Sequence, residues 1–577
     1  MILYLTVKNI LNRLKIKPSK IFLITYFVTL AFIMSIPLLQ RGFVCGDDWE
    51  YHLARIQNIS YCLSLGIFPA KIHITSLNGY GYGSGLFYPN LFLYFPAMLR
   101  FWGLGLSASY KIFLIIVIFL TIISSYFSTK YIFKSRYAAI IASTMFATSQ
   151  TFITNAYLRC AVGETLAAIF LPIMIASLYN IIYDKFSKPW ILILGFLGLI
   201  YCHTISLFLS ILIFTFVLIV NCKTVFFSKN LPKYHGLKVL MKLFIAAFIV
   251  LLLSISYWLA MLEQFCFAKF NVNNEGIRIG DYSLKLSELF CSARPGLGLP
   301  LLLLSMIFIL LSVNRKFKLS RHFIIIGLIL AFLSTSLFKW KLFNNTIINK
   351  IQFPWRLCPL AALFLSIGVG GCINSTFRKI KERKMVLIFL FVLTGIFSIN
   401  VLTSISDNCI DLPTDICNHG FSIGGGCEWL PLKTDIEKLN FPDKVYTSNG
   451  RSINLSKRIG NTIYFLYNEN LYDKSDHFDV PLLFYKGYSA TILKVDGTIK
   501  ALSVVNSPNN NLCRVLNDEN LEGEICVKYS GTKLQHISYF INFFATIIAL
   551  IFIGYKFINR KRQFILSKYK GWKLKWF

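Results

Sequence analysis

Three carboxylates fall within four consecutive positions near the start of the chain, in the segment Gly46-Asp47-Asp48-Trp49-Glu50-Tyr51-His52. The segment follows an apolar run from Ile21 to about Leu39, which is long enough to cross a bilayer. Ionisable groups placed at the end of such a run often serve a function. Carboxylates can accept a proton from a hydroxyl group or bind a cation, so this segment is the first candidate site.

Part of this cluster has a plain structural explanation. Asp47 and Glu50 have the spacing of a capping box, in which both carboxylates satisfy free N–H groups at a helix start. A helix is expected because apolar or small residues recur at 3/4 spacing and would form its buried face: Trp49, Leu53, Ile56, Ser60 and Leu63. Capping does not explain Asp48, His52 and Arg55, which share another face. The density of titratable groups favours a functional role for Asp48, with His52 beside it.

Residues 78–89 form an uncharged segment rich in glycine and tyrosine. A phosphate-binding glycine loop needs a lysine and a strand-turn-helix context, both of which are absent here, so a nucleotide-binding P-loop is excluded. Tyr80, Tyr82 and Tyr88 suit aromatic platforms for a sugar ring. An ordinary re-entrant turn explains the segment equally well.

Polar residues also stand at the outer ends of predicted spans: Arg159, Glu164, His203, Arg294 and Arg356. Outward arginines are uncommon when positive charge marks the cytoplasmic side, and guanidinium binds phosphate through two parallel N–H bonds. The arginines are therefore candidate ligands for a lipid-linked phosphate, and Glu164 and His203 for the substrate. The alternatives are an Arg159–Glu164 ion pair, a membrane anchor at Arg356 and a packed His203.

The composition describes the elements that must position these residues. The chain has 577 residues, 55% of them hydrophobic and 15% charged, with a mean hydropathy of +0.61. These values exclude a disordered chain, a soluble single-core enzyme and a disulfide miniprotein. The formal net charge is +33, but the basic residues lie between apolar runs of membrane length. They indicate topology, and no nucleic-acid partner is expected.

The basic clusters set the predicted topology. They hold 32 basic residues and two acids, Asp184 and Glu382. Placing all of them inside predicts a polytopic α-helical membrane protein of about twelve spans, with an uncleaved first helix and both termini in the cytoplasm. Residues 190–221 are expected to form two short spans that turn near His203, and 88–104 a helix on the outer membrane face.

We predict three regions: a transmembrane domain over 1–404 with a long outer loop at 40–107, an outer domain over 405–536, and a last span with a basic tail over 537–577. The outer domain holds 16 acids against 13 basic residues. Its short β-branched and aromatic runs, separated by Asn-Gly and Asp-Gly turns, indicate a β-sandwich. Cys409/Cys417 and Cys513/Cys526 are plausible disulfide pairs there.

The order of these motifs resembles bacterial GT-C membrane glycosyltransferases, and more closely the YfhO-like subgroup labelled "6-pyruvoyl-tetrahydropterin synthase-related". The matching segments are Gly46-Asp-Asp-x-x-x-His-x-x-Arg55, Gly66-x-x-Pro69, the Gly-Tyr-Gly loop, Tyr88-Pro89, Tyr157-Leu-Arg159, Gly163-Glu164, His203, Gln352-Phe-Pro-Trp-Arg356, Cys427-Glu-Trp-Leu-Pro431 and Pro481-Leu-Leu-Phe-Tyr-Lys-Gly-Tyr488. The likeness runs from the first span to the last. The family's usual Glu-Tyr-Leu-Pro pattern reads Glu428-Trp-Leu-Pro431 here, which keeps an aromatic residue.

The resemblance implies that a sugar carried on polyprenyl phosphate is transferred, with inversion, to a cell-envelope acceptor such as lipoteichoic acid outside the plasma membrane. It implies an acidic base in the first outer loop, which would be Asp48, or Asp47. The partners would be the lipid-linked donor, the glycan acceptor and membrane lipid. Asp47 and Asp48 are hard oxygen ligands that could hold a divalent cation, but no metal or other cofactor is required.

Two other functions fit parts of the sequence. A transporter or flippase for a lipid-linked saccharide would more often show inverted repeats and polar groups at mid-membrane. A non-catalytic glycan-binding subunit would tolerate replacement of Asp48. The acids gather at the membrane edge, which favours the enzyme.

Overall fold

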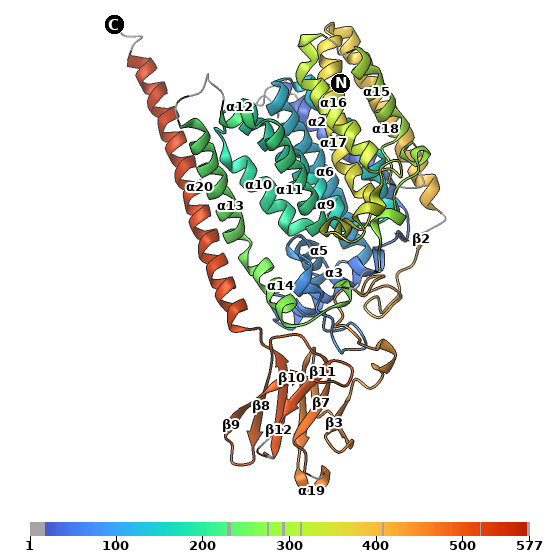
Figure 1. Ribbon diagram of the computed structural model, residues 1–577, viewed down its shortest axis with the longest axis vertical. Coiled ribbons are helices and arrows are strands. Elements are labelled where there is room, and N and C mark those ends of the chain that lie inside the picture. Colours follow the sequence, from blue (N-terminus) through green and yellow to red (C-terminus); the bar gives the residue numbers. More distant parts are fainter. Residues whose placement is uncertain are drawn as a thin grey trace, which may run out of the picture. The chain divides into compact units, whose positions relative to one another are not determined.

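A computed structural model describes residues 18–573 apart from 228–231, 233, 274–275, 291–294, 312–313, 407–408, 473, 518 and 520. The chain divides into two compact units (Figure 1). Unit 1 comprises Met1–Lys242 and Asn271–Glu428, and unit 2 comprises Leu243–Phe270 and Trp429–Phe577. The helix α13 (His235–Leu253) crosses the boundary between them.

Unit 1 is a bundle of apolar helices. They are α2 (Pro18–Ser35), α6 (Leu106–Phe133), α7 (Arg136–Ala147), α9 (Val162–Tyr183), α10 (Pro189–Cys202), α11 (Thr204–Val220), α12 (Cys222–Phe226), α15 (Leu299–Leu311), α16 (Lys318–Leu333), α17 (Cys358–Thr376) and α18 (Ile380–Ser406). α17 lies at the centre and packs on α7 and α16, while α6 packs on α7 and α9. Gly327 and Gly368 let the backbones of α16 and α17 approach closely, as small residues do between membrane helices.

Seven helices in the described part of the chain are long and apolar enough to cross a membrane: Ile21–Leu39, Leu106–Phe133, Val162–Tyr183, His235–Leu253, Pro354–Thr376, Ile380–Ser404 and Lys533–Asn559. Four shorter apolar helices accompany them, so the predicted number of about twelve spans is not confirmed. α10 and α11 meet at His203, where the sequence predicts a turn. α5 (Tyr94–Phe101) has eight residues, about 12 Å of helix, which is too short to span.

Short elements lie between the first long helices of unit 1. They are β1 (Phe43–Val44), α3 (Trp49–Ser64), α4 (Ser84–Phe87), α5 and α8 (Gln150–Ile153). The predicted helix at 49–64 is confirmed, and Trp49, Leu53, Ile56 and Ser60 are buried on its expected face. His52 and Arg55 on the other face are buried as well, so α3 is enclosed on both sides.

Unit 2 contains α14 (Ile255–Phe267), α20 (Lys533–Lys573) and two five-stranded antiparallel sheets. One sheet has the order β10 (Val504–Asn506), β11 (Leu512–Leu516), β7 (His477–Leu483), β3 (Lys444–Thr447), β4 (Ser452–Asn454). The other has the order β5 (Lys457–Ile459), β6 (Thr462–Tyr467), β12 (Gly523–Tyr529), β8 (Tyr488–Lys494), β9 (Ile499–Leu502). Phe465 of β6 contacts Phe478 of β7 across the sheets, with ring centroids 5.4 Å apart. This confirms the predicted sandwich.

The sandwich domain begins later than predicted. Residues 409–428 belong to unit 1, where β2 (Cys409–Ile410) pairs with β1. Asn58 of α3 contacts the Cys417 sulfur at 3.3 Å. The many turn residues in 409–428 suggested that this segment is part of the sandwich. Its strand, β2, instead pairs with β1 in the first loop.

The two predicted disulfides are not formed. Cys409 contacts Gln40, with 2.9 Å between its sulfur and Oε1, and Cys417 lies against α3. Cys513 belongs to β11 and Cys526 to β12, which are strands of different sheets. All four are free thiols.

Candidate functional site

Asp48 directly precedes α3, yet its side chain forms no capping hydrogen bond. The Glu50 carboxylate contacts Nδ1 of His419 at 2.8 Å and accepts the backbone N–H of Phe421. The expected capping box between Asp47 and Glu50 is therefore wrong, because a distant segment uses the Glu50 carboxylate.

The turn that carries Asp48 is pressed against the backbone of Arg159. The Asp48 N–H donates to the Arg159 carbonyl oxygen at 2.9 Å. A Cβ at Gly46 would lie 2.6 Å from the Leu158 oxygen and 2.9 Å from the Cys160 nitrogen. Only glycine permits this approach, so Gly46 sets the position of the carboxylate relative to residues 158–160.

Arg159 follows a single π-helical turn, η3 (Thr154–Leu158), a local geometry that is frequent at functional sites. The turn brings Asn155 beside Arg159. The Asn155 Oδ1 accepts from Nη1 of Arg159 at 2.7 Å, and its Nδ2 donates to Oε2 of Glu164 at 3.1 Å. Asn155 thus fixes both ions of the pair.

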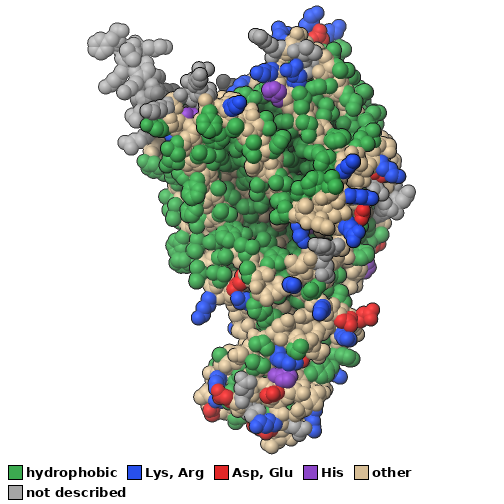
Figure 2. Space-filling model, viewed as in Figure 1, with side chains coloured by type: hydrophobic (Ala, Val, Ile, Leu, Met, Phe, Trp, Pro, Cys, Tyr) green, Lys and Arg blue, Asp and Glu red, His purple; other side chains and the backbone are tan. Residues whose placement is uncertain are grey.

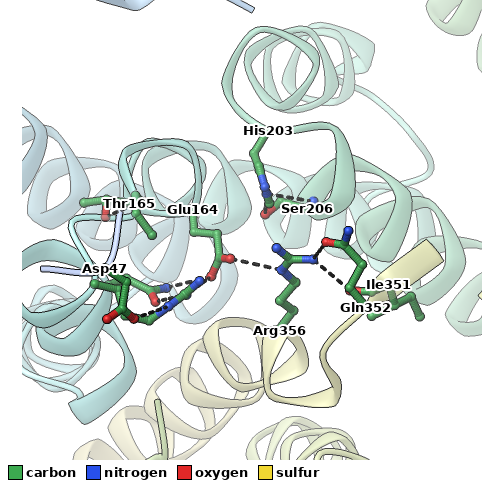
Figure 3. A network of polar contacts seen from close by, with 11 residues as sticks. Asp47, Glu164, Thr165, His203, Ser206, Ile351, Gln352 and Arg356 are labelled. Atoms are coloured by element: carbon green, nitrogen blue, oxygen red, sulfur yellow. Dashed lines mark hydrogen bonds and ion pairs between the residues drawn. The ribbon is translucent and has the colours of Figure 1, made fainter. Parts of the chain in front are cut away.

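Glu164 lies between two arginines (Figure 3). Its Oε2 is 2.9 Å from Nη1 of Arg159 and its Oε1 is 3.2 Å from Nε of Arg356. The side chains of Arg159 and Arg356 are each 11% exposed and that of Glu164 is 5% exposed. The Arg356 Nη1 also donates to the Ile351 carbonyl at 2.9 Å and to Oε1 of Gln352 at 2.6 Å. The buried triad therefore carries one net positive charge.

Asp48 lies within the electrostatic field of this triad. Burial raises the pKa of its carboxyl from 3.8 to about 6, against the lowering effect of Arg159. Glu164 and Asp47 raise this pKa and Arg356 lowers it. Asp47 is different, since its side chain is 74% exposed and its Oδ2 is 4.0 Å from Nε of Arg159. Of the two aspartates, Asp47 is the exposed one and Asp48 is the one partly buried beside the triad.

His203 and Tyr88 adjoin the triad. The Nδ1 of His203 accepts the backbone N–H of Ser206 at 3.2 Å, which places the proton of a neutral ring on Nε2. The ring centroids of His203 and Tyr88 are 6.2 Å apart. Gly163 lets both side chains approach the backbone beside Glu164, since a Cβ there would collide with the Tyr88 hydroxyl and meet His203 Cδ2 at 3.0 Å.

Arg55 holds Tyr88 and His52 in place. Its Nη2 donates to the Pro89 carbonyl and to Oδ1 of Asn90, both at 2.7 Å, and its guanidinium lies 4.3 Å from the Tyr88 ring centroid. The Nη1 of Arg55 is 3.2 Å from Nδ1 of His52. Burial, reinforced by Arg55, lowers the pKa of His52 well below 6.5, so this ring is neutral near pH 7.

Not every predicted site residue joins this cluster. Tyr82 pairs its backbone with His73 and its side chain is fully buried, and Tyr80 is 3% exposed; as sugar platforms they stay predictions. Arg294 lies outside the described residues. The Arg159–Glu164 ion pair, which the sequence offered as the alternative to phosphate binding, is present.

The structure adds residues that the sequence analysis did not assign to the site. Asn155 stands four positions before Arg159, and Gln352 four before Arg356, so the spacing of helical neighbours could have found both. Burial raises the pKa of Glu428, while nearby Arg356 lowers it. The carboxylate of Glu428 is enclosed by Gly424 and Gly426. Across the described residues, no three His, Cys, Asp or Glu side chains are grouped to hold a metal ion.

No family model matches the chain. It is 23% identical over 259 residues to an uncharacterized protein of Lactococcus lactis subsp. cremoris strain MG1363, which covers 44% of this chain and 41% of the relative. The chain thus spans about two fifths of that protein's length.

Solved structures with some likeness include the archaeal oligosaccharyltransferase AglB from Archaeoglobus fulgidus in complex with an inhibitory peptide and a dolichol-phosphate. Its TM-score is 0.37 and its identity 14%, over 69% of this chain and 57% of that one. The same organism's enzyme in the apo form has a TM-score of 0.38 and an identity of 14%, over 68% of this chain and 57% of that one. The enzyme in complex with zinc and sulfate has a TM-score of 0.38 and an identity of 15%, over 68% of this chain and 54% of that one. At these low scores neither a shared fold nor an activity follows from the likeness.

Proposed function

We propose that this chain is a membrane glycosyltransferase of the GT-C type. It moves a sugar from a polyprenyl-phosphate donor to a cell-envelope acceptor, such as lipoteichoic acid or another surface glycan, on the outer face of the bacterial plasma membrane. One observation carries the proposal: a half-buried Asp48 carboxylate lies in the field of two buried arginines that share one glutamate. The order of motifs along the sequence supports the same class.

The geometry suits an inverting displacement. In this reaction Asp48 accepts the proton of the acceptor hydroxyl as its oxygen attacks the anomeric carbon. The bond from that carbon to the phosphate oxygen breaks, and polyprenyl phosphate leaves with the electron pair. A base with a pKa near the working pH is the most effective one, and the pKa of Asp48 is raised to about 6.

The leaving phosphate needs a positive partner. Arg159 and Arg356 outweigh Glu164 by one charge within the buried triad, and charge in a partly water-free site stabilises a developing anion strongly. Arg294 would add to this set. His203 and Tyr88 contact one another beside the triad, and we assign them, together with Glu164, to the substrate.

The positions of these residues along the helices support a site on the outer side of the membrane. Glu164 stands near the start of α9, Arg356 just before α17, and His203 between α10 and α11. These positions are the helix ends remote from the basic clusters, which the positive-inside rule assigns to the cytoplasm. A transporter would be expected to carry its polar residues nearer mid-membrane.

The experiment compares a deletion strain with the same strain complemented by the wild-type gene. The envelope polymers are analysed for sugar content by mass spectrometry. In a second measurement, membranes from cells fed radiolabelled glucose are permeabilised with detergent, and the transfer of label from lipid to polymer is followed. A transferase is needed for label to pass from lipid to polymer even when the bilayer is permeable. If permeabilised deletion membranes transfer label as well as wild type, the transferase proposal fails and transport is favoured.

A further inference from the structure

A hollow lies in unit 1, beside the C-terminal half of α9 and away from the triad at the start of that helix. It is a cavity of about 230 Å³ between α9, α11, α16 and α17, and its walls are almost entirely apolar. Six of its lining residues matter here: Tyr179, Tyr183, Val220, His322, Ile325 and Ile326.

The hollow is open at the surface of the bundle. Tyr183, Val220 and Ile325 line it and are 51%, 66% and 40% exposed. An apolar groove that opens on the flank of membrane helices is filled by hydrocarbon, because water there would leave its walls unfavourably hydrated. The groove therefore fits an acyl chain.

The rim of this groove is basic. Lys318 precedes His322 by one helical turn and Arg321 adjoins it, and both act on the His322 ring electrostatically. Across the groove the Nζ of Lys134 lies 5.9 Å from the ring of Tyr179. Figure 2 shows hydrophobic side chains over the visible helices, with Lys and Arg at their upper ends and along the right edge of the view.

The acid nearest to that rim is already engaged. Asp184 accepts the Tyr131 hydroxyl at 2.5 Å and the Ser187 hydroxyl at 2.9 Å. Lys134 and Lys188 lie over the same Tyr131 ring, at 4.1 and 4.4 Å from its centroid. Because Lys134 and Lys188 also act electrostatically on Asp184, the cations that we assign to an approaching anion are Lys318 and Arg321, beside His322.

We propose that this groove binds an anionic glycerophospholipid, with an acyl chain against α9, α11 and α16 and its phosphate beside Lys318, Arg321 and His322. Tyr179 stands fifteen residues after Glu164 on α9, about 22 Å along the helix axis, so this is not the phosphate site of the triad. The basic helix ends belong to the inner leaflet by the positive-inside rule, and anionic lipids are enriched there.

The test uses the full chain in nanodiscs of phosphatidylcholine with or without phosphatidylglycerol. Lipid that stays bound after detergent extraction is counted by native mass spectrometry. Wild type should retain phosphatidylglycerol in preference to phosphatidylcholine, and Lys318→Ala/Arg321→Ala should bind it about tenfold or more weakly. The matched control, Lys379→Ala/Lys381→Ala, removes the same charge from the start of α18 and should bind as wild type does.

Ile326→Trp fills the groove without changing charge and should also release the lipid. Equal retention of the two lipids by wild type, or undiminished phosphatidylglycerol binding in both rim and groove variants, would overturn the proposal. Polyprenyl phosphate that displaces phosphatidylglycerol from wild type but not from Ile326→Trp would assign the groove to the donor instead.

Discussion

The backbone N–H of Asp48 donates to the carbonyl oxygen of Arg159 at 2.9 Å. This bond joins the first loop to the residue that pairs with Glu164, over more than one hundred positions of sequence. The carboxylate that we assign as base and the guanidinium that we assign to phosphate are therefore held by one backbone contact. A change in either segment should be felt in the other.

Transfer should depend on pH through Asp48. Burial raises the pKa of this carboxyl to about 6, and only the ionised form accepts a proton. Activity should therefore fall as the pH is lowered through about 6 and level off above it. The measurement is the initial rate of label transfer in permeabilised membranes across the range. A rate that is constant through this interval would contradict the assignment.

Gly46→Ala should impair transfer although no reactive group is lost. The added methyl would lie 2.6 Å from the Leu158 oxygen, so the Asp48 turn must move away from Arg159. Displacement of a catalytic group by about 1 Å can cost about a hundredfold in rate. Gly105→Ala is the matched control, because nothing lies within 4 Å of a Cβ there and φ is −60°. Equal rates for the two variants would count against the close approach.

Glu164→Gln should destabilise unit 1. The carboxylate, 5% exposed, is shared by two arginines that are each 11% exposed, and removing one member of a buried ionic group costs about 3–5 kcal/mol. Thermal unfolding in detergent measures the change. Asp415→Asn, which alters an exposed carboxylate of the same unit, should leave the unfolding temperature unchanged. A shift no larger than that of the control would show that the triad is not a stabilising unit.

Glu50→Gln should loosen residues 409–428. The Glu50 carboxylate accepts the Phe421 N–H and contacts His419 at 2.8 Å, and an amide replaces one of its two acceptor oxygens by a donor. Limited proteolysis of the folded protein should then cut this segment faster, since cleavage follows the population of the opened form. Unchanged cleavage would mean that the β1–β2 pairing alone holds the segment.

The sequence predicted what depends on local pattern. The helix at 49–64, the turn at His203 and the β-sandwich all follow from periodicity and turn residues that act within a few positions. The contacts of the Glu50 carboxylate with His419 and Phe421 could not be predicted, because these partners are 369 and 371 residues away in the sequence. The Arg159–Glu164 pair lies at one helix start and could be predicted from its spacing, but only the fold shows that Arg356, almost two hundred positions later, joins it. The predicted number of about twelve spans is not confirmed, because the described part of the chain has seven helices of membrane length and four shorter apolar helices.

Asp48→Asn tests the central claim most directly, with Asp47→Asn as its matched control. Burial raises the pKa of Asp48 to about 6. At neutral pH the carboxylate is ionised in both states, and this ionised form is less favourable in the folded state than in the unfolded state. The asparagine variant should therefore be at least as stable as wild type at neutral pH.

In the deletion strain, at equal expression, we expect Asp48→Asn to lower transfer by about a hundredfold or more, within the range for loss of a general base. Asp47→Asn should restore most of the sugar on the envelope polymer. If Asp48→Asn restores the sugar as fully as wild type does, Asp48 is not the base and the proposed mechanism is contradicted.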